Sequence, residues 1–263
     1  VLDSKNITPY FLKGIIYRDL GDYENASNSI YQALKIEPNN PEINNSYGVL
    51  LGILNKFEES INYFKKAINQ KKEFIDPLAN IALAYHKIQS YKIAKEYYLK
   101  TKNYYENKKI PENKKNIIFK NYINYGAMLQ ELGDSKKAIE NYKLALKFND
   151  NNAEVYNNIG IALGEAGETK KASEYYRKSL DINNEYYAAF RHLCTTGLIE
   201  TDDPLFLKME KLLDTNIDDN NKMLIAYGTS FIYDKNKNYK KAFKYSKFAN
   251  QIINQKITYT NDI

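Results

Sequence analysis

The sequence predicts an all-α fold, a right-handed α-solenoid (superhelix) of about seven helix pairs. The first indication is a repeat, because residues 124–151 and 158–185 are near copies of one another. The second is a constant spacing of 34 residues between equivalent small and aromatic residues, which are Gly126/Gly160, Gly133/Gly167, Ala138/Ala172 and Tyr142/Tyr176. A period of this length is typical of two-helix units that pack only against their neighbours.

The 34-residue repeat frame can be extended in both directions along the chain. It predicts a single solenoid over residues 1–263. The repeats lie near residues 7–40, 41–74, 75–118 (with an insertion), 119–152, 153–186, 187–222 (degenerate) and 223–256. Domain counting by length does not apply to such a chain, because each repeat contacts only the next.

Each repeat carries small residues where its two helices approach. On the second helix these are Ala26, Ser60, Ala94, Ala138, Ala172 and Ala242, and on the first helix Gly14, Gly48, Ala82, Gly126 and Gly160. A larger filler follows at Ile30, Phe64, Tyr98, Tyr142 and Tyr176. Larger side chains at the small positions would push the helices apart.

Turn residues mark where the helices of the repeats end and begin. Gly21, Gly133 and Gly167 stand where a first helix ends in a left-handed cap, and an acidic or hydroxyl residue follows to begin the next helix. Pro38 and Pro41 separate the first two repeats. Period, small residues, aromatics and turn glycines together resemble the tetratricopeptide repeat family over nearly the whole chain.

Two segments depart from the frame. Between Lys102 and Ile118 the chain gains about ten residues, which predicts a lengthened second helix and a polar loop around Pro111. In the degenerate repeat, Phe206 replaces the expected small residue. We expect two helices there that pack differently, the second one beginning at Asp203-Pro204.

The composition argues against several classes of site. The single cysteine, Cys194, cannot form an internal disulfide, and with two histidines no zinc cluster of Cys and His can be assembled. Cys194 occupies the small position of a first helix, which favours a structural thiol, and both His86 and His192 read as ordinary, partly exposed residues. No apolar run could cross a membrane. We therefore expect a cytoplasmic protein with no cofactor, no metal and no membrane partner.

No catalytic constellation is visible, so we expect this chain to be a binding module and not an enzyme. The glycine-rich phosphate motifs do not occur, and the pairs Gly48/Gly52 and Gly160/Gly164 are explained by helix contact. The sequence gives no indication of oligomeric state or of the partner's identity.

The first helices should line an inner groove. Asparagine recurs at the sixth position of three successive repeats, although it is a poor helix former by roughly 0.5 kcal/mol relative to alanine. A carboxamide offers both a donor and an acceptor to an extended peptide. The predicted groove residues are Asn45, Ser46, Val49, Asn80, Leu83, Asn124, Ala127, Asn158 and Ile161. The acids Glu42, Asp76 and Glu154 argue against an acidic ligand.

This arrangement is similar to the asparagine ladder in the repeats attached to O-linked N-acetylglucosamine transferase, which holds substrate peptide backbones. The resemblance implies a protein or an extended peptide as the partner. An alternative explanation is that asparagine is common throughout this chain.

Two other functions stay open. The last 75 or so residues resemble the repeat region before the catalytic domain of bacterial tetratricopeptide-sulfotransferase fusions, which implies a substrate-recruiting arm of a larger sulfotransferase-like or glycosyltransferase-like enzyme. Lysine pairs at Lys136-Lys137, Lys170-Lys171 and Lys240-Lys241 could instead follow nucleic-acid phosphates. We favour a solvated face for these lysines over nucleic-acid binding.

Overall fold

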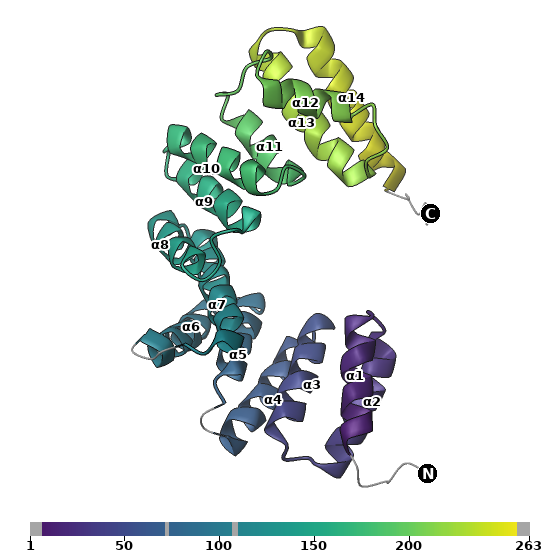
Figure 1. The fold of residues 1–263 in the computed structure, drawn as a ribbon, viewed down its shortest axis with the longest axis vertical. Helices are drawn as coiled ribbons and strands as arrows, with labels where there is room; N and C mark the ends of the chain where they lie inside the picture. The colour runs from purple at the N-terminus through teal and green to yellow at the C-terminus, as the bar shows by residue number, and fades with distance from the viewer. Residues whose placement is uncertain (1–6, 72–73, 107–109, 257–263) are drawn as a thin grey trace, which may run out of the picture. The chain divides into compact units, whose positions relative to one another are not determined.

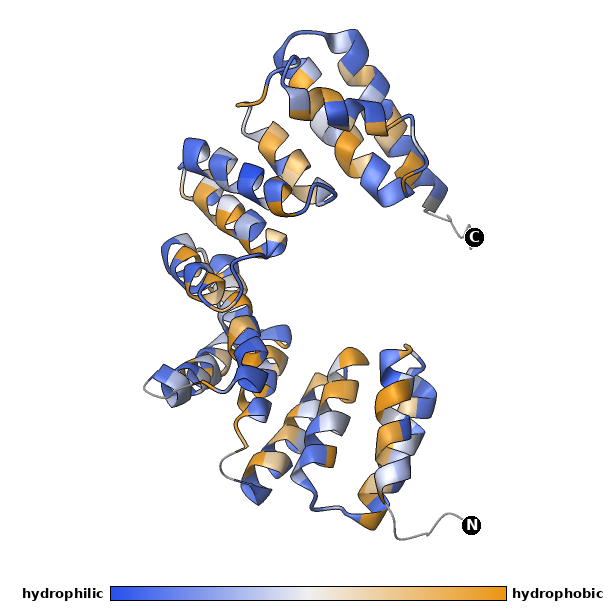
Figure 2. Ribbon diagram, viewed as in Figure 1, coloured by the Kyte–Doolittle hydropathy of each residue, from blue (hydrophilic) through white to orange (hydrophobic). Residues whose placement is uncertain are grey.

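A computed structural model describes residues 7–71, 74–106 and 110–256, and these residues form fourteen α-helices and no strand (Figure 1). The predicted all-α helical-repeat fold is thus confirmed, whereas the right-handed sense of the superhelix stays a prediction. Figure 2 shows hydrophobic and hydrophilic residues side by side on the helices, as expected for amphipathic elements.

The chain divides into two compact units, residues 1–128 and 129–263, and the boundary falls inside α7. The first unit holds α1 (Ile7–Asp19), α2 (Tyr23–Ile36), α3 (Pro41–Ile53), α4 (Phe57–Gln70), α5 (Asp76–Lys87), α6 (Tyr91–Glu106) and most of α7 (Glu112–Glu131). The second holds α8 (Ser135–Leu146), α9 (Ala153–Glu165), α10 (Thr169–Ile182), α11 (Tyr187–Thr195), α12 (Pro204–Leu212), α13 (Asp219–Lys235) and α14 (Tyr239–Lys256). The single solenoid over the whole chain stays a prediction.

The turn inside each regular repeat has one backbone geometry. Gly21, Gly133 and Gly167 have φ near +79°, as their left-handed position requires. The residues that stand at the same position of the other regular repeats, Asn55, Gln89 and Lys237, have φ of 59° without being glycine. The repeat therefore imposes this turn even where the side chain disfavours it.

Capping side chains begin several helices. Asp22, Asn40, Asp134, Asn152 and Asp218 each accept a hydrogen bond from a backbone N–H of the first helical turn. Such bonds satisfy amide donors that have no partner within the helix. Short polar residues in the turns before these five helices thus help to fix where each of them starts.

The small and large residues pack as predicted within the helix pairs. The small position of the second helix and the filler are buried in each repeat for which the sequence predicts both (Ala26/Ile30, Ser60/Phe64, Ala94/Tyr98, Ala138/Tyr142 and Ala172/Tyr176). The glycine of the first helix lies directly against the filler side chain: a Cβ on Gly14 would lie 2.4 Å from Cγ1 of Ile30, and 3.3 Å from the backbone oxygen of the small residue Ala26. The filler covers the glycine and thereby sets the distance between the helices.

The insertion is distributed over two helices. The predicted lengthening of the second helix is present, because α6 has 16 residues whereas α2 and α4 have 14. However, α7 begins at Glu112, seven residues before the predicted start near Phe119, and runs for 20 residues. The amino group of Lys114 reaches back to Asp76, with 2.7 Å between Nζ and Oδ1, and holds this added part of α7 against the start of α5.

The degenerate repeat packs as a three-helix arrangement. α12 begins at Pro204 and is capped by Asp203, as predicted. Phe206 is fully buried and contacts the rings of Phe190 and Tyr233. The backbone of α11 packs closely against α13, where a Cβ on Gly228 would lie 3.1 Å from the Cys194 sulfur. Because a phenylalanine replaces the small residue, α11 makes its closest helix contact with α13.

Candidate functional site

A pocket of about 270 Å³ opens in the first unit between the α3–α4 pair and α5. Its walls are mainly apolar, and a few polar side chains stand among them. The lining residues are Val49, Gly52, Ile53, Asn55, Phe57, Ser60, Phe64, Asn80, Leu83, Ala84 and Lys87. Three of the predicted groove residues, Val49, Asn80 and Leu83, therefore come together here.

Two glycines of α3 determine the shape of this pocket. A Cβ on Gly48 would lie 2.6 Å from the ring of Phe64, so this glycine serves the contact between α3 and α4. A Cβ on Gly52 would meet nothing within 4 Å. The prediction that helix contact explains both glycines is therefore wrong for Gly52, whose missing side chain leaves the pocket open.

The carboxamides of two predicted residues join α3 to α5. The Asn80 amide nitrogen donates a hydrogen bond to the Asn45 side-chain oxygen over 3.1 Å. Both side chains are half-buried. The bond uses one donor and one acceptor, so further hydrogen-bonding capacity remains on each carboxamide. The neighbouring Asn44 differs, because it is buried and donates to the carbonyls of Pro38 and Asn40.

The remaining predicted residues lie outside this pocket. Ser46 is half-buried on α3, and Asn124 and Ala127 are half-buried on α7. Asn158 and Ile161 are half-buried on α9, in the second unit. The structure thus groups Asn45, Val49, Asn80 and Leu83.

Gly52, Ile53 and Phe57 are among the pocket residues that the sequence did not assign to the groove. Ile53 is an exposed isoleucine at the end of α3, with 42% of its surface accessible. Phe57 is half-buried at the start of α4. An exposed isoleucine followed by a turn and an aromatic residue is a signal that could have pointed to this end of the groove.

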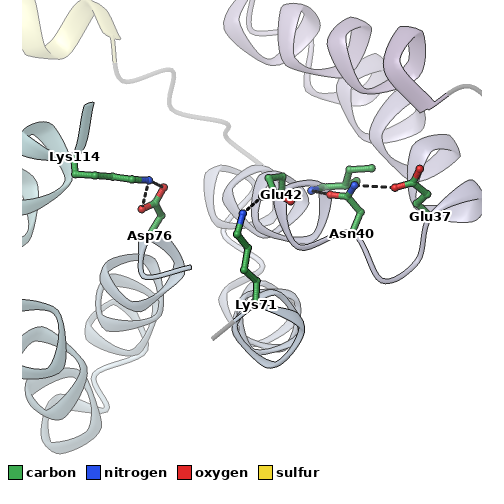
Figure 3. A network of polar contacts seen from close by, with 7 residues as sticks. Glu37, Asn40, Glu42, Lys71, Asp76 and Lys114 are labelled. Atoms are coloured by element: carbon green, nitrogen blue, oxygen red, sulfur yellow. Dashed lines mark hydrogen bonds and ion pairs between the residues drawn. The ribbon is translucent and has the colours of Figure 1, made fainter. Parts of the chain in front are cut away.

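Two of the three acids in the predicted groove are paired with lysines. The Glu42 carboxylate accepts a hydrogen bond from Lys71 at 2.7 Å, and Asp76 forms an ion pair with Lys114 (Figure 3). The bond to Lys71 holds the pKa of Glu42 below its usual range. The expectation that these acids argue against an acidic ligand is therefore weakened in the first unit, because the charges of Glu42 and Asp76 are compensated.

The environments of Cys194, His86 and His192 are those of structural residues. Cys194 is buried, and burial raises the pKa of its thiol, so it is an inert structural residue. His86 is buried and not partly exposed as predicted, with its Nδ1 3.4 Å from the Tyr98 hydroxyl. Nδ1 of His192 lies 2.8 Å from Oδ1 of Asn157, and burial lowers the pKa of this imidazole.

Within the described ranges, no group of three or more His, Cys, Asp or Glu side chains could hold a metal ion. Over the same ranges no helix is long and apolar enough to cross a membrane.

One lysine of each predicted outer pair is engaged locally. Lys137 and Lys171 form ion pairs with Asp134 and Glu168 at the starts of their own helices. Lys241 donates to the Tyr233 hydroxyl over 2.9 Å. These contacts leave fewer cations to bind phosphates than the sequence alone indicates.

Sequence comparison identifies the repeats. Family profiles described as tetratricopeptide repeat match residues 7–40, 41–74 and 118–185, which together make up just over half of the chain. These matches do not include residues 187–256, on which the resemblance to sulfotransferase fusions depends. No match was found among curated protein sequences.

Solved structures with the same fold include several repeat proteins. PilF of Pseudomonas aeruginosa is 16% identical, with a TM-score of 0.64 over 80% of this chain and 93% of PilF. The apo form of RapI is 17% identical, with a TM-score of 0.62 over 95% of this chain and 99% of RapI. YrrB, described as a TPR protein with an unusual peptide-binding site, is 18% identical, with a TM-score of 0.51 over 71% of this chain and 91% of YrrB. At these identities the similarity concerns the fold.

Proposed function

The chain belongs to the tetratricopeptide repeat family, and on that premise we propose that it is a protein-interaction module whose first unit binds an extended peptide in the pocket between α3, α4 and α5. The observation that carries this proposal is an apolar pocket lined by the carboxamide of Asn80, which is hydrogen-bonded to the neighbouring carboxamide of Asn45. The pocket accepts a side chain, and the carboxamides hold the backbone.

The size of the pocket favours a side chain as its occupant. Sites for drug-sized ligands enclose about 300–1,000 Å³, whereas this pocket encloses about 270 Å³. Val49, Ile53 and Leu83 supply aliphatic walls, and Phe57 supplies an aromatic one. A large apolar side chain of a peptide would bury its surface here at about 25 cal/mol per Å².

The carboxamide pair favours an extended backbone. A peptide in the extended conformation presents an N–H and a C=O that helices and turns would otherwise use internally. The hydrogen bond between Asn45 and Asn80 fixes the orientation of both amides before a ligand arrives. These side chains therefore lose less conformational entropy when the ligand binds.

The charge at the rim favours an acidic group on the peptide. Lys87 lines the pocket and is exposed, and none of the described acids forms an ion pair with it. Glu42 and Asp76 are already compensated by Lys71 and Lys114. A carboxylate beside the apolar side chain would therefore meet a positive field.

The peptide-binding site named in the description of YrrB supports the class of function, although its identity to this chain is only 18%. The alternative, a recruiting arm of a larger sulfotransferase-like or glycosyltransferase-like enzyme, has only the resemblance of residues 187–256 behind it. The intact mass of the protein in its native host, compared with the 30.6 kDa of this chain, tests that alternative.

A phage-displayed library of random peptides, selected against the chain, tests the proposal. Gly52→Leu should abolish capture of the enriched peptides by filling the pocket, and Asn80→Ala should weaken their binding by roughly five- to tenfold, as expected for losing one or two hydrogen bonds. Asn62→Ala, at an exposed position on α4, is the matched control and should bind normally. Equal capture by wild type and Gly52→Leu would refute the pocket as the site.

A further inference from the structure

The hydroxyl of Tyr176 lacks the partner that the other filler tyrosines have. In two repeats the filler hydroxyl contacts the residue that stands twelve positions earlier, on the first helix, namely His86 for Tyr98 (3.4 Å to Nδ1) and Gln130 for Tyr142 (3.1 Å to Oε1). The residue twelve positions before Tyr176 is Gly164. Among the residues that the structure describes, none forms a hydrogen bond with the Tyr176 hydroxyl, although only 5% of this residue is exposed.

Gly164 leaves this hydroxyl within reach of a ligand. A Cβ on Gly160 would lie 2.5 Å from the Tyr176 ring, so helix contact explains that glycine. Gly164 is exposed, and beyond its own helix and chain neighbours a Cβ there would meet only the Tyr176 hydroxyl oxygen, at 3.9 Å. Gly52 has the same position in its repeat but faces Phe64, which has no hydroxyl. The space over Gly164 therefore ends on a polar group, whereas the space over Gly52 does not.

A carboxylate stands beside this space. One oxygen of Glu165 accepts a hydrogen bond from Nε2 of Gln130 over 2.8 Å, and the other accepts one from the Ser135 hydroxyl over 3.0 Å. Both donors are neutral, so they orient the carboxylate without compensating its charge. Each of its oxygens has a further lone pair with which to bind a ligand.

The charges that act on the two filler hydroxyls of this region are negative. Burial and the charge of Glu165 raise the pKa of Tyr176 to about 12, so the hydroxyl stays protonated. Burial also raises the pKa of Tyr142, with Glu165, Glu131 and Glu154 adding to the effect. Glu154 is exposed at the other end of α9 and, within the described ranges, forms no ion pair. A cation would therefore be attracted to this surface.

The basic residues of the adjacent helices do not neutralise Glu165. In the described part of the chain no lysine or arginine forms an ion pair with it. Lys137, Lys171 and Arg177 pair with other acids, Lys178 and Arg191 lie over the rings of Tyr175 and Tyr227, and Lys136, Lys143 and Lys170 are exposed. His192, whose ring centroid is 5.5 Å from that of Tyr176, has a pKa lowered by burial. Its imidazole is therefore neutral at neutral pH and does not repel a cation.

We propose that the second unit binds a basic peptide side chain over Gly164, with N–H groups of that side chain donating to the Tyr176 hydroxyl oxygen and to the Glu165 carboxylate. Arginine suits the site best, because its planar guanidinium carries five donors and can serve two acceptors at once. The Tyr176 proton stays available for a carbonyl of the same peptide. The inference shares with the proposed function the premise that the chain binds peptides, but its residues all belong to the second unit.

Titration of the 263-residue chain with the peptide N-acetyl-Ala-Arg-Ala-amide, followed by amide NMR, tests the site. The largest shifts should fall on the amides of Gly164 and Glu165. The same peptide with citrulline in place of arginine keeps the shape of the side chain and removes its charge. It should bind roughly tenfold more weakly, as expected for losing a charge-assisted hydrogen bond. Equal binding of the two peptides, or no shift at Gly164 and Glu165, would overturn the proposal.

Variants separate this site from the pocket of the first unit. Tyr176→Phe should weaken binding of the arginine peptide roughly five- to tenfold and Glu165→Gln roughly tenfold. Phe64 fills the equivalent position in the first unit, so Tyr176→Phe should fold, and circular dichroism checks this. Gly52→Leu and Glu174→Gln, the latter at an exposed position on α10, should bind like wild type. Unchanged binding by Tyr176→Phe and Glu165→Gln would refute the site whatever the outcome for the first unit.

Gly164→Gln tests the missing partner without any ligand. The new side chain stands where Gln130 stands relative to Tyr142, so it should bond the Tyr176 hydroxyl and block the arginine peptide. Urea unfolding should show a larger gain in stability in the wild-type background than in Tyr176→Phe, because only the former offers the hydroxyl. An equal gain in both backgrounds would contradict a hydroxyl that is open to a partner.

Discussion

The α-carbon of Gly48 lies under the ring of Phe64, so that a Cβ on this glycine would come within 2.6 Å of the ring carbon Cε1. The same relationship joins Gly160 to Tyr176 in the second unit, at 2.5 Å. In both pairs the aromatic residue follows the glycine by 16 positions. A backbone without a side chain is therefore what allows the second helix to bring a ring against the first.

Gly48→Ala should lower the free energy of unfolding by about 1–3 kcal/mol, because the added methyl group overpacks the contact with Phe64. The better helix propensity of alanine, worth about 1 kcal/mol, offsets part of this loss. Urea unfolding followed by circular dichroism measures the change. Gly52→Ala is the control, since its Cβ meets nothing within 4 Å, and it should leave stability unchanged or raise it.

Lys237→Gly should raise the free energy of unfolding by about 0.5–1 kcal/mol. Lys237 has φ of 59° in the turn between α13 and α14, and a residue with a Cβ is strained there by roughly 1–2 kcal/mol, part of which the greater entropy of unfolded glycine offsets. Gly133→Ala, at the equivalent turn position, should change stability by a similar amount in the opposite direction. A destabilised Lys237→Gly would show that its side chain contributes more than the strain costs.

Asp76→Asn should free the added part of α7. The ion pair with Lys114 is only partly exposed, and its loss should lower the free energy of local opening by about 1 kcal/mol. Amide hydrogen exchange in residues 112–118 should therefore become about fivefold faster. Glu112→Gln breaks the exposed pair with Lys115 and should change exchange much less. Lys114→Met should reproduce the effect of Asp76→Asn, and the double variant should add little more.

His192 should make the second unit less stable in mild acid. Burial holds its pKa below the ordinary value of 6.5, so the unfolded chain binds a proton more readily than the folded one. This contribution is fully present above pH 6.5, is lost as the pH falls from there through the folded pKa, and does not change further below it. His192→Gln should flatten the decline in the free energy of unfolding between about pH 7.5 and 5.5, measured in urea at several pH values. The low-pKa carboxyl groups of Glu42 and Glu200 act below this window.

Much of the fold follows from local spacing. We could predict the 34-residue period, the burial of the large filler residues and the start of α12 at Asp203-Pro204. Each depends on residues within one repeat or on its immediate neighbour. The left-handed turns at Gln89 and Lys237 carry no glycine, so only the frame reveals them. The early start of α7 depends on a contact between Lys114 and Asp76, which are 38 residues apart, and no local pattern contains it.

The candidate site was predictable in part. Periodicity placed Val49, Asn80 and Leu83 on one surface, and they line the pocket together. The open space over Gly52 depends on how α5 approaches α3 and α4, which the spacing of residues does not determine. The same holds for the bond between Asn45 and Asn80, which joins the fifth position of one repeat to the sixth of the next.

Methyl NMR of the complex with a selected peptide tests the central claim most directly. With Ile, Leu and Val methyl groups labelled, the binding site predicts intermolecular nuclear Overhauser effects from an apolar peptide side chain to Val49, Ile53 and Leu83, all of which line the pocket. Methyl groups of α12, such as Leu207, should show none. Contacts to methyl groups elsewhere, with those of Val49, Ile53 and Leu83 unaffected by the peptide, would contradict the account.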